Sequence, residues 1–354
     1  MINSVVKVFI SFFLTFSLGI LITPFLTNYL YKNKMWKKKA RNEALGGGET
    51  PIFNALHKEK ETGTPRMGGI IIWASVLVTI FILSFLSDLF PSVATQKLNF
   101  LSQNQTWLPL FALVSASLIG LLDDILQVRG GGGYVAGGLA LSKRILFVLT
   151  IGFIGAYWFY FKLGVSVIMI PFVGPFELGI LFIPFFMLVT LAIFSGGVID
   201  GIDGLAGGIM AVIFAAYGVI AFFQSQIDLA TFCAAIVGGI LAFLWFNIPP
   251  ARFYMSETGM LGLTVTLSII AFLTDSVVVL PIIAFPLIAT SASVIIQYLS
   301  KKLRGGKKVF LVAPLHHHFE AIGWPACKVT MRYWVISIVF AVVGMIIAVM
   351  GITL

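Results

Sequence analysis

Long runs of apolar residues alternate with short polar segments along almost the whole chain. Most of these runs exceed the roughly 18 residues that indicate a membrane-spanning helix. The pattern predicts ten spans, at residues 5–31, 67–90, 106–123, 145–163, 179–198, 207–224, 229–247, 259–274, 277–299 and 333–353. The first run is longer than the apolar core of a signal peptide, so we expect it to remain as a helix.

One apolar segment, residues 164–178, is too short to span a bilayer. Its β-branched residues, prolines and glycines predict a short β-hairpin outside the membrane. The expected fold class is an all-α polytopic membrane protein with about ten transmembrane helices and a short periplasmic β-hairpin. We expect residues 1–354 to form a single integral membrane domain. The sequence has no internal repeat, which gives no support to an inverted-repeat transporter.

The composition agrees with the pattern. Hydrophobic residues make up 59% of the 354 residues, and only 10% are charged, whereas soluble domains carry about 25% charged residues. A soluble fold of this size cannot bury so much apolar surface. Cys233 lies in an apolar run and Cys327 in a polar segment, so nothing suggests a disulfide framework.

Basic residues are concentrated in one of the two sets of loops that ten spans define. This set contains 20 of the 23 Lys and Arg residues and comprises 32–66, 124–144, 199–206, 248–258 and 300–332. The positive-inside rule therefore places these loops in the cytoplasm and both the N- and C-termini outside. The net charge of +9 reflects topology first and attraction to anionic lipid second. No nucleic-acid partner is needed to explain it.

The unusual polar residues all fall in this basic set of loops or at the span ends beside it. The first group is the adjacent pair Asp123 and Asp124, which ends the span 106–123. Carboxylates at membrane depth are costly and usually functional, and oxygen ligands of this kind suit Mg²⁺. Taken alone, the pair is equally compatible with a solvated helix end.

The second group is Asp200 and Asp203 in the segment DGIDG. If the segment is helical, the i, i+3 spacing places both carboxylates on one face. The flanking glycines permit tight turns and a close approach of a ligand to the backbone. Two acids in an otherwise uncharged loop favour a functional role over an ordinary polar connection.

The third group lies between Asn247 and Gly259, where Glu257 is the only acid. The adjacent aromatic residues Phe253 and Tyr254 can stack on a nucleobase or belong to the interfacial aromatic belt, which is the commoner role. Glu257 begins a span, where an acid also complements the helix dipole. This loop is weak evidence by itself.

The fourth group is the triplet His316, His317 and His318 in APLHHHFE. Three consecutive histidines cannot all bind one metal ion, and no cysteine accompanies them, so a structural zinc site is not expected. Histidines can instead contact phosphates or donate hydrogen bonds. This is the most specific signal in the chain.

Five segments together resemble the phospho-N-acetylmuramoyl-pentapeptide-transferases, in order from about residue 50 to the C-terminus. They read TGTPRMGG, LLDDILQVR, DGIDGLAGG, FNIPPARFYM and KVFLVAPLHHHFEAIGWPACKV. The resemblance implies a phosphotransferase of the bacterial inner membrane that acts in peptidoglycan precursor synthesis. It implies UDP-N-acetylmuramoyl-pentapeptide and undecaprenyl phosphate as substrates, lipid I and UMP as products, Mg²⁺ as cofactor and a cytoplasmic active site. It is compatible with a homodimer.

The resemblance also implies roles for individual residues. Asp123 and Asp124 match the family's aspartate pair, one of which activates or orients the lipid phosphate. Asp200, Asp203 and the three histidines match further catalytic positions. The expected substrate-binding residues are Lys60, Lys143 (with Arg144 competing for its position), Asn247 and Tyr254, the last stacking on uracil. Glu257 stands at the position of a Mg²⁺ ligand.

The sequence departs from the family pattern at three positions. Gly197 replaces an asparagine, Gln127 replaces a lysine, and Glu257 replaces an aspartate. The alternatives are a related transferase that uses UDP-N-acetylglucosamine, against which the HHHFE segment argues, and a catalytically silent homologue. A transporter would place charged groups at mid-membrane, where the sequence shows none.

Overall fold

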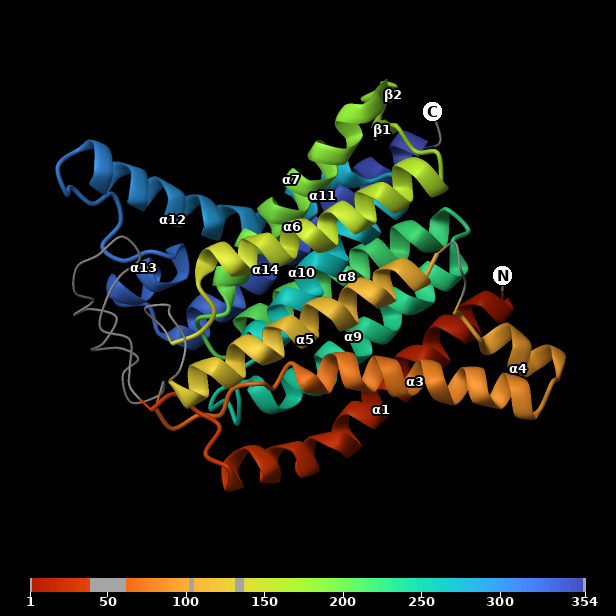
Figure 1. Cartoon of the computed structure of the whole chain (residues 1–354), viewed down its shortest axis with the longest axis horizontal. Coiled ribbons are helices and arrows are strands. Elements are labelled where there is room, and N and C mark those ends of the chain that lie inside the picture. Colours follow the sequence, from red (N-terminus) through yellow and green to blue (C-terminus); the bar gives the residue numbers. More distant parts are fainter. Residues whose placement is uncertain (1, 39–61, 102–104, 131–136, 353–354) are drawn as a thin grey trace.

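The computed structural model describes residues 2–38, 62–101, 105–130 and 137–352. Figure 1 shows these residues as a bundle of long helices with a small hairpin at one end. The α-helices are α1 (Ile2–Lys32), α3 (Ile70–Leu89), α4 (Val93–Leu98), α5 (Trp107–Arg129), α6 (Leu141–Tyr157), α7 (Phe182–Ser195), α8 (Leu205–Phe223), α9 (Ile227–Asn247), α10 (Ser256–Leu273), α11 (Leu280–Ile283), α12 (Phe285–Leu303), α13 (Leu315–Ala321) and α14 (Ala326–Ile352).

The expected number of spans is confirmed. Among the described residues, nine helical segments are long and apolar enough to cross a membrane, and a bent pair can supply a tenth. The span predicted at 277–299 is bent: the chain turns by 79° between Val277–Ile283 and Phe285–Leu303. Pro286, in the first turn of α12, has no amide hydrogen with which to continue the preceding helix. As a result, α12 extends away from the bundle (Figure 1).

The predicted end of the third span, at residue 123, is wrong. Helix α5 continues to Arg129 and ends at Gly130, whose φ of 69° is left-handed. Asp123 and Asp124 therefore lie inside the helix, about one and a half turns before its end, and both are buried. Ile125 and Val128 continue the apolar pattern beyond the acids, and Gly130 is the residue type that favours a helix C-terminus of this kind.

The centre of the bundle is built from α5, α8, α9 and α10, and α10 is buried along almost its whole length. Glycines allow α5 and α10 to cross at very short range. A Cβ atom added at Gly120 would lie 2.1 Å from the carbonyl oxygen of Glu257, and one at Gly262 would lie 2.0 Å from Ser117 Oγ. Small residues at such crossings let backbones approach closely. This crossing brings the aspartate pair of α5 against the first turn of α10.

The predicted hairpin is confirmed. Strands β1 (Val167–Ile170) and β2 (Gly174–Glu177) pair antiparallel, with Val167 opposite Glu177. The hairpin, the beginning of α1 and the end of α14 lie at the same end of the bundle (Figure 1). The first and the last described helix thus begin and end, respectively, at the same end of the bundle.

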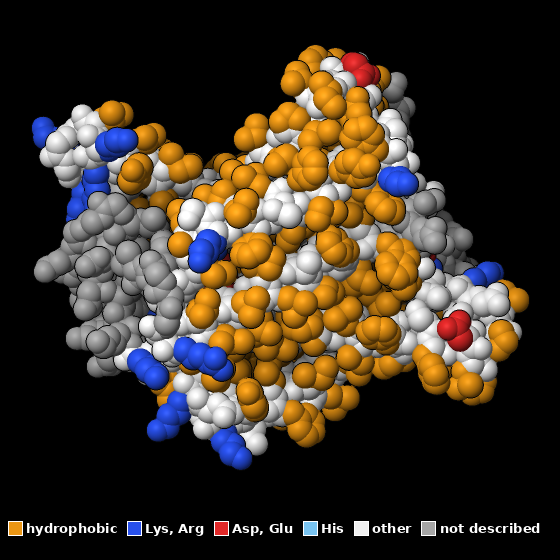
Figure 2. Space-filling view, in the orientation of Figure 1, with side chains coloured by type: hydrophobic (Ala, Val, Ile, Leu, Met, Phe, Trp, Pro, Cys, Tyr) orange, Lys and Arg blue, Asp and Glu red, His pale blue; other side chains and the backbone are white. Residues whose placement is uncertain are grey.

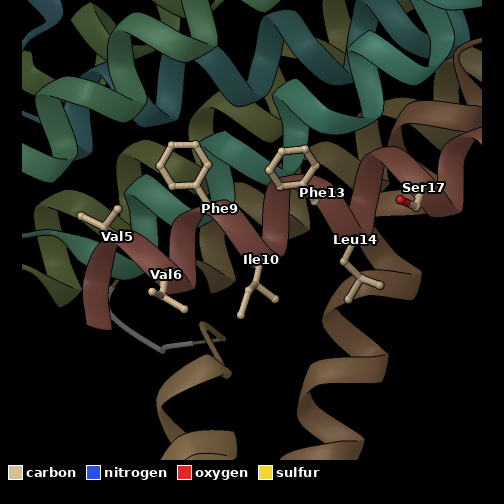
Figure 3. A pocket seen from close by; sticks show the side chains of 7 residues that line it. All are labelled: Val5, Val6, Phe9, Ile10, Phe13, Leu14 and Ser17. Carbon is tan, nitrogen blue, oxygen red and sulfur yellow. The ribbon is translucent and has the colours of Figure 1, made fainter. Parts of the chain in front are cut away.

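On the face shown in Figure 2, apolar side chains cover the bundle between its two ends, and basic side chains gather mainly at the end opposite the hairpin. This distribution is that of a multi-pass membrane protein. A shallow depression on α1 is lined by Val5, Val6, Phe9, Ile10, Phe13, Leu14 and Ser17 (Figure 3). None of these side chains is titratable, so this depression belongs to the lipid-facing surface and not to the chemistry.

Candidate active site

Asp124 joins three separate parts of the chain. Its side chain is fully buried and accepts hydrogen bonds from Arg66 Nε at 3.2 Å and from the backbone amide and hydroxyl of Thr258 at 2.9 and 2.6 Å. Burial opposes the charge of Arg66, but Asp124 and two further carboxylates hold its pKa above the ordinary value. Arg66 is therefore a permanent cation in the loop that precedes α3.

The carboxylate of Asp123, like that of Asp124, has several hydrogen-bonding and charged partners. It accepts hydrogen bonds from Gln127 Nε2 at 2.7 Å and from the amide of Leu139, and forms an ion pair with Arg144 Nη2 at 3.0 Å. The second terminal nitrogen of Arg144 pairs with Glu257 Oε1. One buried guanidinium therefore connects an acid of α5 to the first acid of α10. Gln127 supplies a neutral donor to Asp123.

Asp200 and Asp203 occupy the turns between α7 and α8. The helical spacing considered for this pair does not apply, because the short 3-10 helix Gly196–Ile199 ends before Asp200 and α8 begins at Leu205. Asp200 Oδ2 accepts the Ser256 amide at 2.8 Å, and Asp203 Oδ2 accepts the Ala251 amide at 3.4 Å. Burial raises the pKa of Asp200 to about 6, although the Ser256 hydrogen bond and Arg66 oppose the shift.

Asn247 fixes the backbone of two neighbouring loops. Its Oδ1 accepts the amide of Gly204 at 3.0 Å, and its Nδ2 donates to the carbonyl of Phe253 at 2.8 Å. These contacts hold the Asn247 side chain between the two loops, and its contact with substrate stays a prediction. Of the two adjacent aromatic residues, Phe253 is fully buried against Phe243 and Phe246.

Tyr254 is half-buried, and its backbone is well anchored. Its amide donates to the carbonyl of Pro65 at 2.9 Å, and its carbonyl accepts the amide of Gly68 at 2.8 Å. The loop that carries Arg66 is thus paired with the loop that carries Tyr254. The tyrosine remains the better candidate for stacking on a base, since Phe253 belongs to the core.

The histidine triplet lies on the short helix α13. His316 and His317 are buried, their ring centroids are 4.2 Å apart, and His317 Nδ1 lies 2.7 Å from Glu320 Oε2. His318 is half-buried, and its Nδ1 accepts the amide of Leu311 at 3.2 Å. The three rings therefore have three different environments, which the sequence alone does not reveal.

Gly201 brings the triplet against the acidic turn. A Cβ atom at this position would lie 2.4 Å from His316 Nε2 and 2.8 Å from His317 Nε2. Two motifs more than 100 residues apart are therefore in contact, and the contact requires glycine.

The basic residues considered for the site differ in where they lie. Lys60 lies outside the described residues. Lys143 is exposed, and it is Arg144 that contacts the acids. Sequence reasoning did not include Arg66, and left Arg144 as an alternative. The available signal was a lone arginine beside the glycines of TPRMGG, at the start of a span.

Among the described residues, acids outnumber arginines in the site. Arg66 interacts electrostatically with Asp124, Asp200 and Glu257, Glu257 interacts with Asp123, and Asp200 interacts with Asp203. Five acids and two arginines therefore form one network. Within the described part of the chain, no three Asp, Glu, His or Cys side chains are grouped so that they could hold a metal ion. The carboxylates are held mainly by arginines and backbone amides.

The sequence was compared with those of known proteins, and the matches indicate its family. The sequence profile of glycosyl transferase family 4 matches residues 106–275. A phospho-N-acetylmuramoyl-pentapeptide-transferase of Listeria monocytogenes is 35% identical over 81% of this chain and 84% of its own length. Relatives of the same name from Geobacillus sp. and Chloroflexus aurantiacus are 33% and 32% identical, over 98% and 88% of this chain and 98% and 84% of their own lengths.

The chain belongs to the phospho-N-acetylmuramoyl-pentapeptide-transferase family. It is a membrane-embedded phosphotransferase of peptidoglycan precursor synthesis. The match covers all four groups of polar residues, which the fold brings to one end of the bundle. Packing does not require a glycine at position 197, because the only described neighbour of an added Cβ within 4 Å is Met260 Cβ at 3.8 Å.

The contact between Gly201 and the histidines yields a testable prediction for this phosphotransferase. Gly201→Ala is expected to lower the transfer rate at least about tenfold, because positioning errors near 1 Å are costly in catalysis and the buried ring of His316 has little room to move. Gly197→Ala is the matched control in the same loop, where the added methyl makes ordinary contact. Transfer rates of both purified variants, with their melting temperatures, test this. Equal rates for the two variants would show that the close contact is unimportant.

Proposed function

We propose that this enzyme transfers phospho-N-acetylmuramoyl-pentapeptide from its UDP donor to undecaprenyl phosphate, forming lipid I. An oxygen of the lipid phosphate attacks the β-phosphorus of the donor. The bond between this phosphorus and the bridging oxygen breaks, and UMP leaves with that oxygen. The observation that carries the proposal is the convergence of the aspartate pair, DGIDG, Glu257 and the histidine triplet at one end of a membrane bundle. A lipid phosphate and a soluble nucleotide can meet at this depth.

Phosphoryl transfer depends mainly on positioning and on stabilising charge. Asp123 and Asp124 hold Arg144 and Arg66 in place through buried ion pairs. A guanidinium has five N–H donors in a planar fork that matches phosphate oxygens. We assign the two arginines, together with the histidine triplet, to the phosphates of the two substrates. The aspartates orient these cations and, through them, the lipid phosphate.

Mg²⁺ fits the charge of the site. If all five acids are ionised, two arginines leave an excess of three negative charges, and Mg²⁺ is usually bound by one or two carboxylates together with substrate phosphates and water. Glu257 and Asp200 are the carboxylates that we assign to it. Glu257 uses Oε1 to pair with Arg144, and Asp200 uses Oδ2 to accept the Ser256 amide. The ion would offset the negative charge of the donor diphosphate.

The assignment of Glu257 is tested by charge removal. Glu257→Gln is expected to lower the rate at least about tenfold and to raise the Mg²⁺ concentration needed for half-maximal rate, because a hard cation loses an anionic oxygen. Glu257→Asp retains the charge and should keep more activity. Rates measured across a Mg²⁺ titration separate this role from a helix-dipole role, which is worth only about 0.3–1 kcal/mol. A Glu257→Gln titration that overlays the unmodified enzyme would remove Glu257 from the metal site.

The remaining groups complete the substrate sites. Tyr254 stacks on uracil, Lys60 contacts the donor, and the lipid-facing surfaces of the spans hold the prenyl chain. The decisive experiment measures UMP release from purified protein with undecaprenyl phosphate and Mg²⁺. UDP-N-acetylmuramoyl-pentapeptide is expected to support turnover, whereas UDP-N-acetylglucosamine is not. Preference for the second donor would reassign the enzyme, and release with neither would mark a silent homologue.

The active site is placed on the cytoplasmic face of the bacterial inner membrane, on the basis of its basic loops. Single cysteines at Arg129 and Lys307, in a Cys327→Ser background, should resist a membrane-impermeant thiol reagent applied to intact cells. A cysteine at Val173, which is 79% exposed on the hairpin, should react. Labelling at Arg129 or Lys307 would overturn this orientation.

A further inference from the structure

A second polar cavity lies at the opposite end of the bundle from the acids. It has a volume of about 550 Å³ and is bounded by the β-hairpin, the loops that follow α8 and α10, and the end of α14. Helix α10 runs from Ser256 to Leu273, which at 1.5 Å per residue is roughly 27 Å. The cavity is therefore separated from the active site by about the thickness of a bilayer core.

Two side chains of this cavity offer hydrogen-bond acceptors to a ligand, the Gln224 amide oxygen and the Asp275 carboxyl group. Gln224 donates through Nε2 to the carbonyl of Thr274 at 2.7 Å, while its buried Oε1 has no hydrogen-bond donor among the described residues. Buried polar atoms without a partner are rare and call for a specific explanation. Asp275 also lines the cavity, from the loop after α10; the residue is exposed at the surface, and the burial that it does have raises the pKa of its carboxyl group.

The rest of the wall is mostly apolar and carries no positive charge among its described residues. Phe172 and Val173 are exposed on the hairpin side, and Val278 is exposed on the side of α11. The cavity thus combines a carboxyl group, a buried side-chain amide oxygen and an apolar rim. A ligand that fits must bring hydrogen-bond donors, a positive charge and an apolar body.

We propose that this cavity binds the primary ammonium headgroup of a membrane aminophospholipid. An ammonium group has three N–H donors and one positive charge, which match the Asp275 carboxylate and the Gln224 oxygen. The hydrocarbon part of the lipid lies against the hairpin and Val278. Ca²⁺ is a poorer fit, because it takes 6–8 oxygen ligands. A choline headgroup has the charge but no N–H donor.

The test compares two headgroups of equal charge. Purified protein in nanodiscs that contain phosphatidylethanolamine is expected to melt at a higher temperature than in nanodiscs with phosphatidylcholine. Native mass spectrometry should show retained phosphatidylethanolamine. Asp275→Asn is expected to abolish the temperature difference and weaken retention about tenfold, because it removes a charge-assisted hydrogen bond.

The variant is chosen to preserve the backbone. Asp275 has a left-handed φ of 47°, and asparagine is among the residues that tolerate this region best. Asp88→Asn, at an exposed position outside the cavity on the hairpin end of α3, is the matched control and should behave as the unmodified protein. Asp275→Asn should also keep its transfer activity, since it lies a full span from the active site.

Three results would overturn the proposal. The first is equal stabilisation by phosphatidylethanolamine and phosphatidylcholine. The second is a phosphatidylethanolamine effect that persists in Asp275→Asn. The third is stabilisation by free phosphoethanolamine without any effect of the phospholipid.

Discussion

Asp124→Asn is expected to lower the transfer rate at least about 100-fold while the protein still folds, the scale typical of losing a positioned catalytic carboxylate. The substitution keeps the shape of the side chain and an oxygen that can accept from Thr258. It removes the negative charge that holds Arg66, so the guanidinium is no longer fixed where the phosphates bind. Asp123→Asn should behave in the same way through Arg144.

UMP release by the purified variants measures the effect, with melting temperature as the check on folding. Asp88→Asn, at an exposed acid at the other end of the bundle, serves as the control and should retain normal activity. Near-normal turnover in folded Asp123→Asn and Asp124→Asn would remove the aspartate pair from the active site.

Arg144→Gln is expected to affect both stability and rate. The side chain is 11% exposed and neutralises two acids at once, Asp123 and Glu257. Removing one partner of a buried ion pair typically costs about 3–5 kcal/mol, because the remaining charge stays buried without compensation. We therefore expect a clearly lower melting temperature and a transfer rate reduced at least about 100-fold, since two site carboxylates lose their orientation.

The adjacent residue provides a matched control. Lys143 has the same charge but is exposed, and Lys143→Gln is expected to stay within about twofold of the unmodified rate, since surface substitutions usually change free energies by less than about 0.5 kcal/mol. Comparing Lys143→Gln with Arg144→Gln separates the effect of a nearby positive charge from the effect of the contacts that Arg144 makes with the acids. If Lys143→Gln were the more damaging change, the basic position would belong to Lys143, as the sequence first suggested.

Much of the fold could be predicted because a bilayer restricts the choice of structure. Backbone groups in lipid must be satisfied within each segment, so long apolar runs become helices. The hairpin was also predictable from its short length and turn residues. The bend before α12 was not, because Pro286 begins a helix here, and a proline in an apolar run does not by itself say how far the two halves diverge.

Individual site residues were harder to predict than the motifs that contain them. Asp123, Asp124 and Glu257 could be singled out because charged groups near apolar runs are rare. The sequence left the choice between Lys143 and Arg144 open, although only one of them reaches the acids. Helical geometry explains this, because neighbouring residues point in directions about 100° apart, and the packing of α6 decides which one faces inward.

The sequence by itself determined that this protein is a multi-pass membrane phosphotransferase and which four segments carry its polar chemistry, since hydropathy and motif content are local properties. Only the tertiary structure decided how those segments meet. The α5–α10 crossing at Gly120 and the contact of Gly201 with the histidines depend on distances between residues far apart in the chain. Contacts of this kind form through close packing, and no local pattern encodes which side chain fills the space that a glycine leaves.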